Sequence, residues 1–249
     1  MDKGILLYCF DTELTSYQKI ANRCVKQIEK YLKMPITIIT DQNTFEAWPN
    51  RPTCDYNIIE IDRANTKLGK PWYNVERFKA FEHSPYKVTA VLDVDYFCYS
   101  DKILKLMESN EDFLVHDRAH DVTYRQSMKY DRESMINLVW ATVLIFKRTQ
   151  KVKNIFDTVG HVKKNYQHYC NLYRISYKNY RNDYAFAIAL NQVNGFTHTE
   201  FIKDSIATVP TDVKILNVDD EGILIRNGES TVLLNGQDLH VLNKEVANV

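Results

Sequence analysis

The sequence predicts an α/β fold in which a mixed, mostly parallel sheet is flanked by helices. Short apolar runs alternate along the chain with stretches whose apolar residues recur every three or four positions, the pattern of strands followed by covering helices. Of the 249 residues, 45% are hydrophobic and 26% are charged, a balance that suits a sizeable core. No Pro-, Gly- or Ser-rich linker divides the sequence, so we expect a single domain over residues 1–249.

The first hundred residues predict the order strand, helix, strand, strand, helix, strand. The first strand is the apolar run GILLYCF, and the helix after it ends where Met34-Pro35 disfavours further helical turns. The predicted elements are a strand at 4–10, a helix at 14–32, strands at 36–40 and 56–62, a helix at 72–81 with Trp72 turned inward, and a strand that ends at Asp93.

A second series of elements follows Asp101. We expect a cap at Asn182 or Asp183 for its last helix, and a C-terminal β-hairpin at 222–234, because alternating runs flank Asn227-Gly228, a favoured two-residue turn. The other predicted elements are a helix at 102–109, a strand at 113–117, an irregular stretch at 118–134, a strand at 137–148, and helices at 151–174 and 182–193.

Charge, cysteine content and hydropathy exclude several classes of protein. The net charge is zero, so the whole molecule exerts no general attraction on nucleic acid or membrane. The five cysteines are scattered without a CxxC pair, which argues against a disulfide framework and a structural zinc site. No run approaches the roughly 20 apolar residues of a membrane span, and the N-terminal stretch lacks the pattern of a signal peptide. We expect a cytoplasmic protein with no membrane contact.

Two carboxylates at the end of the most apolar run, in VTAVLDVDYFCYSD, are the first candidates for function. Aspartate is poor in strands and costly to bury unpaired. Asp93 and Asp95 project from one face about 6.6 Å apart, and ligands of open α/β sheets bind beyond the carboxyl ends of the strands. Two carboxylates there suit Mg²⁺ or Mn²⁺ together with a diphosphate. The alternative is an aspartate that caps the next turn.

The segment SPYKVTAVLDVDYFCYSD resembles the metal-site segment of GT-A nucleotide-sugar glycosyltransferases, and is most similar to glycosyltransferase family eight and its bacterial and viral relatives. Three later stretches follow in the order of that family: NLVWATVLIF, NDYAFAIALN and HVLNK. Two features depart from it. Trp140-Ala141 replaces a small Ser-Gly pair, and HVLNK lacks the Gly and Pro-Trp of the family pattern.

The resemblance implies a role for each matched residue. It implies that Asp95 and His240 bind Mn²⁺ or Mg²⁺, and that Asp93 contacts the metal or the ribose of the donor. It further implies that Lys244 contacts the diphosphate and that Asp183 lies near the reacting sugar carbon. The implied activity is transfer of a sugar from a nucleotide-diphosphate sugar, with UDP as the expected nucleotide, to a hydroxyl acceptor.

Further candidates for binding the donor lie near the ends of the first strand and the helix at 72–81. Lys79 matches a basic position that precedes the metal-site strand in the relatives, whereas Arg77 is expected to be a solvated helix charge. The end of the first strand suits a stacked and hydrogen-bonded nucleotide base, or else core packing and a helix cap, through Tyr8, Phe10, Asp11 and Thr12.

Residues 147–181 carry nine basic residues, one acidic residue and five tyrosines. Cations interleaved with aromatic rings suit a phosphate backbone and exposed bases. On this interpretation the acceptor is DNA or RNA, for instance a hydroxylated base of viral DNA, or an anionic saccharide. The other interpretation is a solvated helix face whose tyrosines point inward.

Two alternatives to a glycosyltransferase remain open from the sequence. AVLDVDYF also resembles the nucleophile strand of haloacid-dehalogenase-type phosphatases, in which Asp93 would attack phosphorus, Asp95 would serve as acid and base, and VDD at 218–220 would be the late acidic motif. Three predicted strands before this one, and Tyr96 at a position usually small in that fold, count against it. The second alternative is a non-catalytic protein that binds nucleic acid through residues 147–181.

Overall fold

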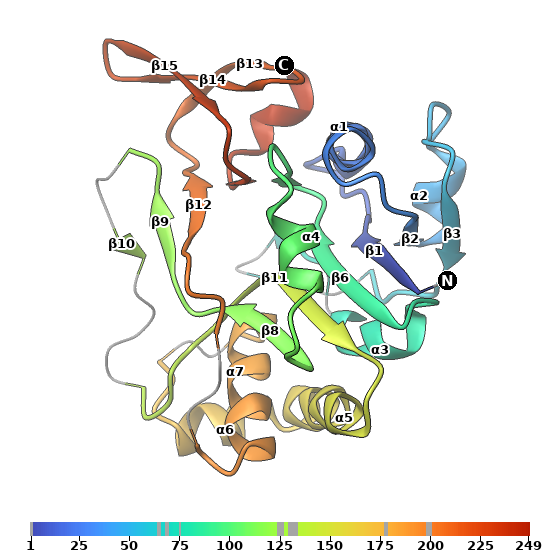
Figure 1. Cartoon of the computed structure of the whole chain (residues 1–249), viewed down its shortest axis with the longest axis vertical. Coiled ribbons are helices and arrows are strands. Elements are labelled where there is room, and N and C mark those ends of the chain that lie inside the picture. Colours follow the sequence, from blue (N-terminus) through green and yellow to red (C-terminus); the bar gives the residue numbers. More distant parts are fainter. Residues whose placement is uncertain are drawn as a thin grey trace.

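A six-stranded sheet with the order β3-β2-β1-β6-β11-β8 forms the centre of the computed structural model (Figure 1). β1, β2, β3 and β6 run parallel, and β11 runs antiparallel to β6 and β8, which confirms a mixed, mostly parallel sheet. The strands are β1 (Lys3–Tyr8), β2 (Ile36–Thr40), β3 (Asp55–Ile58), β6 (Val88–Asp93), β8 (Phe113–His116) and β11 (Trp140–Lys147). The structure describes residues 2–63, 66–67, 70–74, 76–123, 127–128, 134–176, 179–197 and 201–249.

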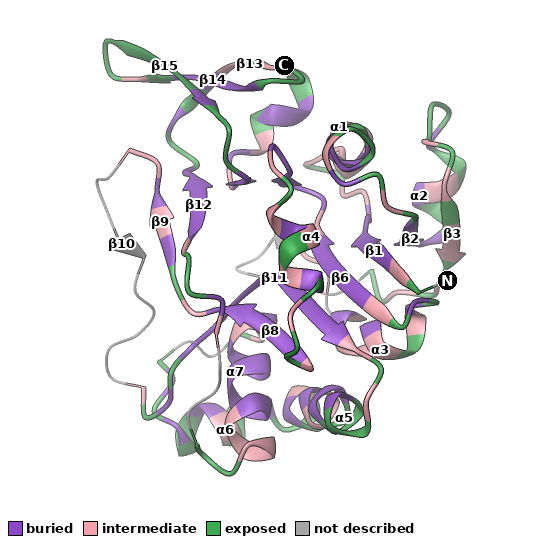
Figure 2. Ribbon diagram, viewed as in Figure 1, coloured by how far each residue is buried: buried purple, intermediate pink, exposed green. Residues whose placement is uncertain are grey.

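Helices cover both faces of this sheet, because alternate strand residues project to opposite sides. Ile5 and Leu7 of β1 belong to one apolar cluster together with residues of α1, whereas Leu6 belongs to a second cluster with residues of α5 and α7. The strands β1, β2, β6, β8 and β11 are accordingly buried along almost their whole length, whereas the edge strand β3 is partly exposed (Figure 2). The helices are α1 (Tyr17–Tyr31), α2 (Gln42–Glu46), α3 (Ala80–His83), α4 (Lys102–Met107), α5 (Gln150–Lys164), α6 (Tyr166–Leu172) and α7 (Asn182–Val193).

The helix predicted at 72–81 is shorter than expected. A 3-10 helix, η1 (Glu76–Lys79), leads directly into α3, and Trp72 lies before both. The backbone carbonyl of Asn74 accepts a hydrogen bond from the side chain of Asn182 at 2.8 Å, which holds this part of the chain in a non-helical conformation against α7. Trp72 therefore lines a pocket instead of packing in the core as predicted.

A second sheet brings a late segment of the chain against the end of β6. In the strand order β10-β9-β12-β16-β7, the last pair is antiparallel and places His240 opposite Tyr96. β9 and β10 lie in the stretch predicted to be irregular, because strands of two or three residues leave too short a pattern to recognise. The strands are β7 (Tyr96–Phe97), β9 (Ala119–Asp121), β10 (Ser127–Met128), β12 (Ile206–Val209) and β16 (Leu239–Val241).

The predicted C-terminal hairpin is present as β14 (Gly222–Asn227) and β15 (Ser230–Asn235), and β13 (Lys214–Val218) adds a third strand. Asn227 pairs with Ser230, so the two turn residues are Gly228 and Glu229, one position later than predicted. Gly228 has φ of +62°, the left-handed conformation that a II′ turn requires at its first position. The remaining elements are β4 (Thr66–Lys67), β5 (Lys70–Pro71) and the 3-10 helix η2 (Lys244–Asn248).

The helical region predicted at 151–174 is two helices that meet at Asn165, and α7 has the predicted bounds. The N-cap of α7 is Arg181, so the predicted cap at Asn182 or Asp183 is wrong. Both side chains instead bond to neighbouring segments, as described below. No helix in the described part of the chain is long and apolar enough to cross a membrane.

Candidate metal and donor site

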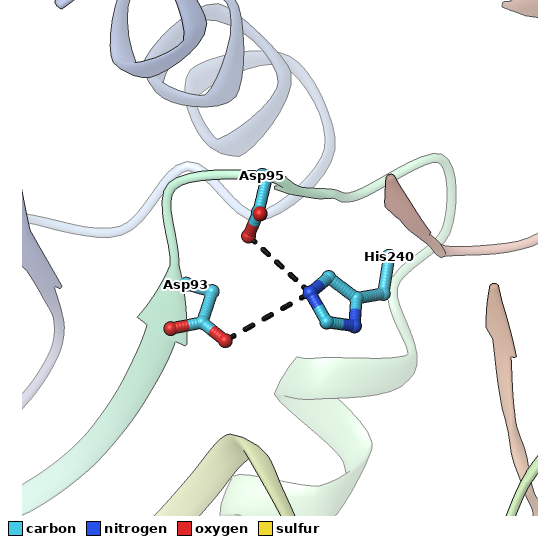
Figure 3. Close-up of side chains that lie close together, drawn as sticks. All are labelled: Asp93, Asp95 and His240. Atoms are coloured by element: carbon cyan, nitrogen blue, oxygen red, sulfur yellow. Dashed lines mark ion pairs between the residues drawn. The ribbon is translucent and has the colours of Figure 1, made fainter. Parts of the chain in front are cut away.

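Three side chains from distant parts of the sequence converge beyond the carboxyl end of β6 (Figure 3). His240 Nε2 lies 3.4 Å from Asp95 Oδ1 and 3.9 Å from Asp93 Oδ2. One ligand atom from each residue lies within 4.8 Å of the other two, a separation that one cation can bridge. The three residues expected from the sequence to form one site therefore lie close together in the structure.

Strand pairing explains why they meet. β6 ends at Asp93, and the chain turns so that Asp95 directly precedes β7. β16 pairs with β7, and the backbone N–H of Val241 donates to the carbonyl of Asp95 at 2.8 Å. This hydrogen bond fixes the register that turns His240 toward the two carboxylates.

Asp95 is only 7% exposed and has a cation beside it. The Lys244 ammonium donates to Asp95 Oδ2 and, at 3.1 Å, to the carbonyl of Val241. Burial raises the pKa of Asp95, but Lys244 and His240 outweigh this effect and hold the pKa well below its usual range. Burial in turn lowers the pKa of Lys244, and the Asp95 carboxylate more than compensates, so this pKa is raised. Both groups are therefore charged at neutral pH.

Asp93 is paired differently. Arg77 Nη1 lies 2.9 Å from Asp93 Oδ1, and Asn74 Nδ2 donates to the same oxygen at 3.3 Å. Burial raises the pKa of Asp93; Arg77 opposes this shift, and the neighbouring Asp95 carboxylate adds to it. Because Oδ1 is occupied, Oδ2 is the oxygen that faces His240.

Arg77 is a residue whose role the sequence prediction missed. Expected as a solvated helix charge, it is 2% exposed and donates to the carbonyls of Ala141 at 2.7 Å and Thr142 at 3.4 Å. Arginine commonly occurs at buried ion pairs, and the position of Arg77 in a predicted amphipathic segment gave no sign of this. Arg77 therefore ties Asp93 to the backbone of β11.

The far side of His240 contacts β11. Trp140 Nε1 donates to His240 Nδ1 at 3.3 Å, and Thr142 Oγ1 lies 3.2 Å from the same nitrogen. Trp140 is thus the residue that departs from the family pattern and also a direct partner of the expected metal ligand.

A cavity of about 260 Å³ opens beside the carboxylates. Of the residues predicted to bind a base, Tyr8, Phe10 and Thr12 line it, and sequence reasoning missed further aromatic residues. Asp11 serves as a helix-start acceptor, since its Oδ1 accepts from the backbone N–H of Gln18 at 2.8 Å. The lining residues are Tyr8, Phe10, Thr12, Tyr17, Trp72, Tyr73, Asn74, Asp93, Val94, Asp95 and Lys244.

Lys79 lies away from this cavity. Its ammonium pairs with Glu76 at 2.8 Å and lines a different pocket, against Phe156 and His161 of α5. η1 turns Arg77 toward the carboxylates and Lys79 toward α5, so the structure does not bring Lys79 together with the other predicted donor-binding residues.

Both carboxylate oxygens of Asp183 are engaged by the protein. Oδ1 accepts from the backbone N–H of Ala141 at 2.9 Å, and Oδ2 accepts from Arg181 Nη2 at 2.6 Å. Asp183 is not among the residues that line the cavity. Asp183 is connected to the site through Ala141 of β11, which lies between Trp140 and Thr142 in the sequence.

The tyrosines of the basic segment 147–181 point inward where the structure describes them. Tyr166 and Tyr173 are 6% and 7% exposed, and Tyr169 and Tyr180 pack against the same cluster. Tyr177 lies outside the described residues. The expectation of exposed rings that stack on bases is therefore wrong for these four tyrosines.

Several cations of this segment have partners. Lys153 pairs with Asp157 at 2.7 Å and Lys163 with Glu76 at 2.9 Å. Arg148 donates to backbone carbonyls, among them that of Ser84 at 2.6 Å. The segment resembles a solvated helix face with a tyrosine-lined inner side, as in the second interpretation of the sequence.

The donor set at the end of β6 suits a hard divalent cation. Mg²⁺ and Mn²⁺ favour carboxylate oxygens, and an imidazole nitrogen is a ligand that Mn²⁺ also accepts. The ammonium of Lys244 already rests on Asp95 Oδ2, which shows that a positive charge is favourable at this point. The residues present therefore fit a metal ion held by Asp93, Asp95 and His240.

No protein-family model matches the sequence, and no curated protein matches it. The structure is similar to the galactosyltransferase LgtC in complex with donor and acceptor sugar analogues, with a TM-score of 0.50 and 14% identity, over 76% of this chain and 70% of LgtC. An active-site mutant of LgtC gives a TM-score of 0.52 over the same shares of the two chains. Mouse xyloside xylosyltransferase 1 gives a TM-score of 0.50 at 10% identity, over 81% of this chain and 84% of that one.

At these identities the likeness establishes the fold. The chain has the GT-A fold of nucleotide-sugar glycosyltransferases, and this expectation from the sequence is confirmed. The late acidic pair that a phosphatase would need lies elsewhere: the carbonyls of Asp219 and Asp220 accept hydrogen bonds from Gln27 and Lys30 of α1.

Proposed function

We propose that this protein is a metal-dependent glycosyltransferase that moves a sugar from a nucleotide-diphosphate sugar to a hydroxyl acceptor. The observation that carries the proposal is the convergence of Asp93, Asp95 and His240 at the carboxyl end of β6, in a GT-A fold and beside an aromatic cavity. Ligands of open α/β sheets bind at this edge.

In this proposal the three residues hold Mn²⁺ or Mg²⁺. The bound cation supplies Lewis-acid stabilisation of the negative charge that develops on the leaving diphosphate. Asp93 reaches the cation through Oδ2, since Arg77 and Asn74 occupy Oδ1. Asp95 offers the oxygens that now accept from Lys244 and face His240.

Lys244 is the residue that would bind the diphosphate. Its ammonium lines the cavity, and a bound cation at Asp95 would release it toward the phosphates. The side chain is long and rotatable, which suits binding a phosphate as a point charge. One lysine would therefore neutralise Asp95 in the empty site and the diphosphate in the loaded one.

The nucleotide base would lie against the aromatic part of the cavity. Tyr8 ends β1, Phe10 follows two residues later, and Trp72 and Tyr73 face the same space. Aromatic faces bind bases by stacking, whatever the base. UDP remains the proposed nucleotide on the strength of the family resemblance.

Asp183 acts in this proposal as a positioning residue. Its two hydrogen-bonded oxygens hold the backbone of β11 at Ala141 and the side chain of Arg181. The sequence expectation placed it beside the reacting sugar carbon. The contacts favour an indirect role, through the strand that carries Trp140 and Thr142.

The acceptor is a hydroxyl compound, and a saccharide is favoured over nucleic acid. The inward tyrosines of residues 147–181 leave little of the exposed aromatic surface on which bases would stack. Lys147, where the segment begins, lies opposite Val88, at the end of β6 remote from Asp93.

A thermal-shift titration tests the proposal. We expect UDP to stabilise the Mn²⁺-saturated protein by about a further 2.7 kcal/mol when its concentration exceeds its dissociation constant a hundredfold. Asp95→Asn should abolish the shift. Asp157→Asn makes the same charge change on an exposed part of α5 and should leave the shift intact. If no nucleoside diphosphate with Mn²⁺ or Mg²⁺ stabilises the wild-type protein, the proposal is wrong.

A further inference from the structure

The two side chains that contact His240 from β11 differ in what they can do. An indole N–H can only donate a hydrogen bond, whereas a threonine hydroxyl can donate or accept. Both contact the same atom, Nδ1 of His240: Trp140 from 3.3 Å and Thr142 from 3.2 Å. The state of that nitrogen therefore decides which contact is favourable.

In the structure as it stands, Nδ1 must be an acceptor. The N–H of Trp140 points at Nδ1, so Nδ1 must offer a lone pair and cannot carry a hydrogen of its own. In an imidazole with a single proton, that proton then lies on Nε2, the nitrogen that faces the carboxylates, 3.4 Å from Asp95 Oδ1. In this tautomer Nε2 donates to Asp95 and has no lone pair for a cation.

A cation between the carboxylates and His240 requires the opposite tautomer. Nε2 must then carry the lone pair, and Nδ1 must carry the proton and donate it to an acceptor. Thr142 Oγ1 is in place to accept it, whereas Trp140 cannot. The proton on Nε2 is lost to solvent and one is taken up at Nδ1, so the two tautomers carry the same charge.

We infer that Trp140 and Thr142 set the tautomer of His240, with Thr142 selecting the form that binds the cation and Trp140 the form that closes the empty site. This inference rests on the proposed metal site and identifies two positioning residues for it. The large residue at position 140, where the resembling family has a small one, thereby acquires a function. Trp140 gives His240 a hydrogen-bond partner in the metal-free site and thereby makes binding of the cation less favourable.

Two shape-preserving substitutions separate the effects. Trp140→Phe keeps an aromatic ring and removes the N–H, and should tighten binding of Mn²⁺ alone by about fivefold, because one competing hydrogen bond is lost. Thr142→Val keeps the branched shape and removes the hydroxyl, and should weaken Mn²⁺ binding by about tenfold, as for other partners of metal-ligating histidines. Free Mn²⁺ measured by electron paramagnetic resonance during a titration gives both values without any assay of activity.

A second measurement reads the tautomer of His240 in the wild-type protein, and needs a variant only to assign the signal. Long-range ¹H–¹⁵N correlation spectra of the imidazole distinguish the tautomers, and His240→Gln identifies the signal. We expect the Nε2–H form in the metal-free wild-type protein and the Nδ1–H form after addition of diamagnetic Mg²⁺.

The outcomes distinguish this inference from the proposed function. If wild-type protein binds Mn²⁺ and Asp95→Asn does not, but both β11 variants bind as wild type does, the metal site stands and the inference is overturned. An Nδ1–H tautomer in the metal-free protein also overturns it. If wild-type protein binds no Mn²⁺, the proposed function itself fails, and the inference fails with it.

Discussion

Arg77 Nη1 lies 2.9 Å from Asp93 Oδ1; the Arg77 side chain is buried, whereas that of Asp93 is 20% exposed and lines the cavity. The same guanidinium donates to the carbonyls of Ala141 and Thr142. One buried cation thus joins the end of β6, which carries the carboxylates, to β11, which carries the partners of His240. The geometry of the whole site depends on this contact.

Arg77→Met should destabilise the protein by about 3 kcal/mol, because it leaves Asp93 without its partner in a buried position. Unfolding in urea measures the change in free energy. The double variant with Asp93→Asn removes the unpaired charge and should recover part of the loss. Arg174→Met, at an exposed position, should change the free energy by less than about 0.5 kcal/mol. Equal losses in the single and double variants would contradict a role for the ion pair.

Lys244→Met should shift two affinities in opposite directions. Without the ammonium on Asp95, no lysine competes with Mn²⁺ for this carboxylate. The affinity for Mn²⁺ in the absence of nucleotide should therefore rise several-fold. The affinity for UDP at saturating Mn²⁺ should fall by about tenfold, the loss of one charge-assisted contact. Isothermal titration calorimetry measures both.

The matched control for this experiment is Lys164→Met, an exposed lysine of α5, which should change neither affinity. If Lys244→Met lowered both affinities, the lysine would support the fold of the site and would not compete with Mn²⁺ for Asp95.

His116 should make stability depend on pH. Burial, followed by the nearby charge of Lys102, lowers the pKa of His116 to about 4, while its Nδ1 donates to the carbonyl of Asp204 at 2.7 Å. The unfolded chain takes up this proton near the ordinary pKa of about 6.5. Stability from the neutral ring is therefore complete above pH 6.5 and is lost as the pH falls toward 4, by about 1.4 kcal/mol per pH unit.

His116→Asn retains a donor for the Asp204 carbonyl and cannot titrate. Urea unfolding at pH 7 and pH 5 should show a difference for the wild-type protein that exceeds that of the variant by about 2 kcal/mol. An identical pH dependence for the two proteins would show that His116 remains neutral in both states or is charged in both.

Trp72→Ala should reduce affinity for UDP by about tenfold, within the range of about 1–3 kcal/mol for one base stacked on an aromatic ring. Trp72 lines the cavity and is only partly buried, so the fold should tolerate the change. Inorganic pyrophosphate with Mn²⁺ serves as the control ligand, because it lacks a base. A similar loss for pyrophosphate would place the effect at the phosphates and not at the base.

The sequence predicted the sheet and the strand-end aspartates Asp93 and Asp95, because buried apolar runs are local signals, whereas His240 was placed beside them only by the family resemblance. It could not predict that η1 would turn Arg77 toward Asp93 and Lys79 away from it. These two residues lie two positions apart in one segment, and which of them reaches the site depends on where a short 3-10 helix begins. That start is fixed by a tertiary contact, the hydrogen bond from Asn182 to the backbone of Asn74.

The tyrosines of 147–181 and the partners of His240 illustrate the same limit. Most of the lysines of this segment lie on α5 and two of its tyrosines on α6, and the tyrosines pack into the apolar cluster that includes α7, which the sequence alone does not reveal. Trp140 was recognised as a departure from the family pattern, but its contact with His240 depends on the pairing of β16 with β7, which no local pattern predicts.

The pairing of β16 with β7 also has a consequence for how the chain folds. Asp95 and Lys244 are 149 residues apart in sequence, so Asp95 stays unneutralised by this lysine until that intervening stretch has been synthesised and β16 has docked. Contacts that close so long a loop are expected to form late. Binding of a cation and a nucleotide would then report that folding is complete, and partly folded chains would be unable to capture the donor.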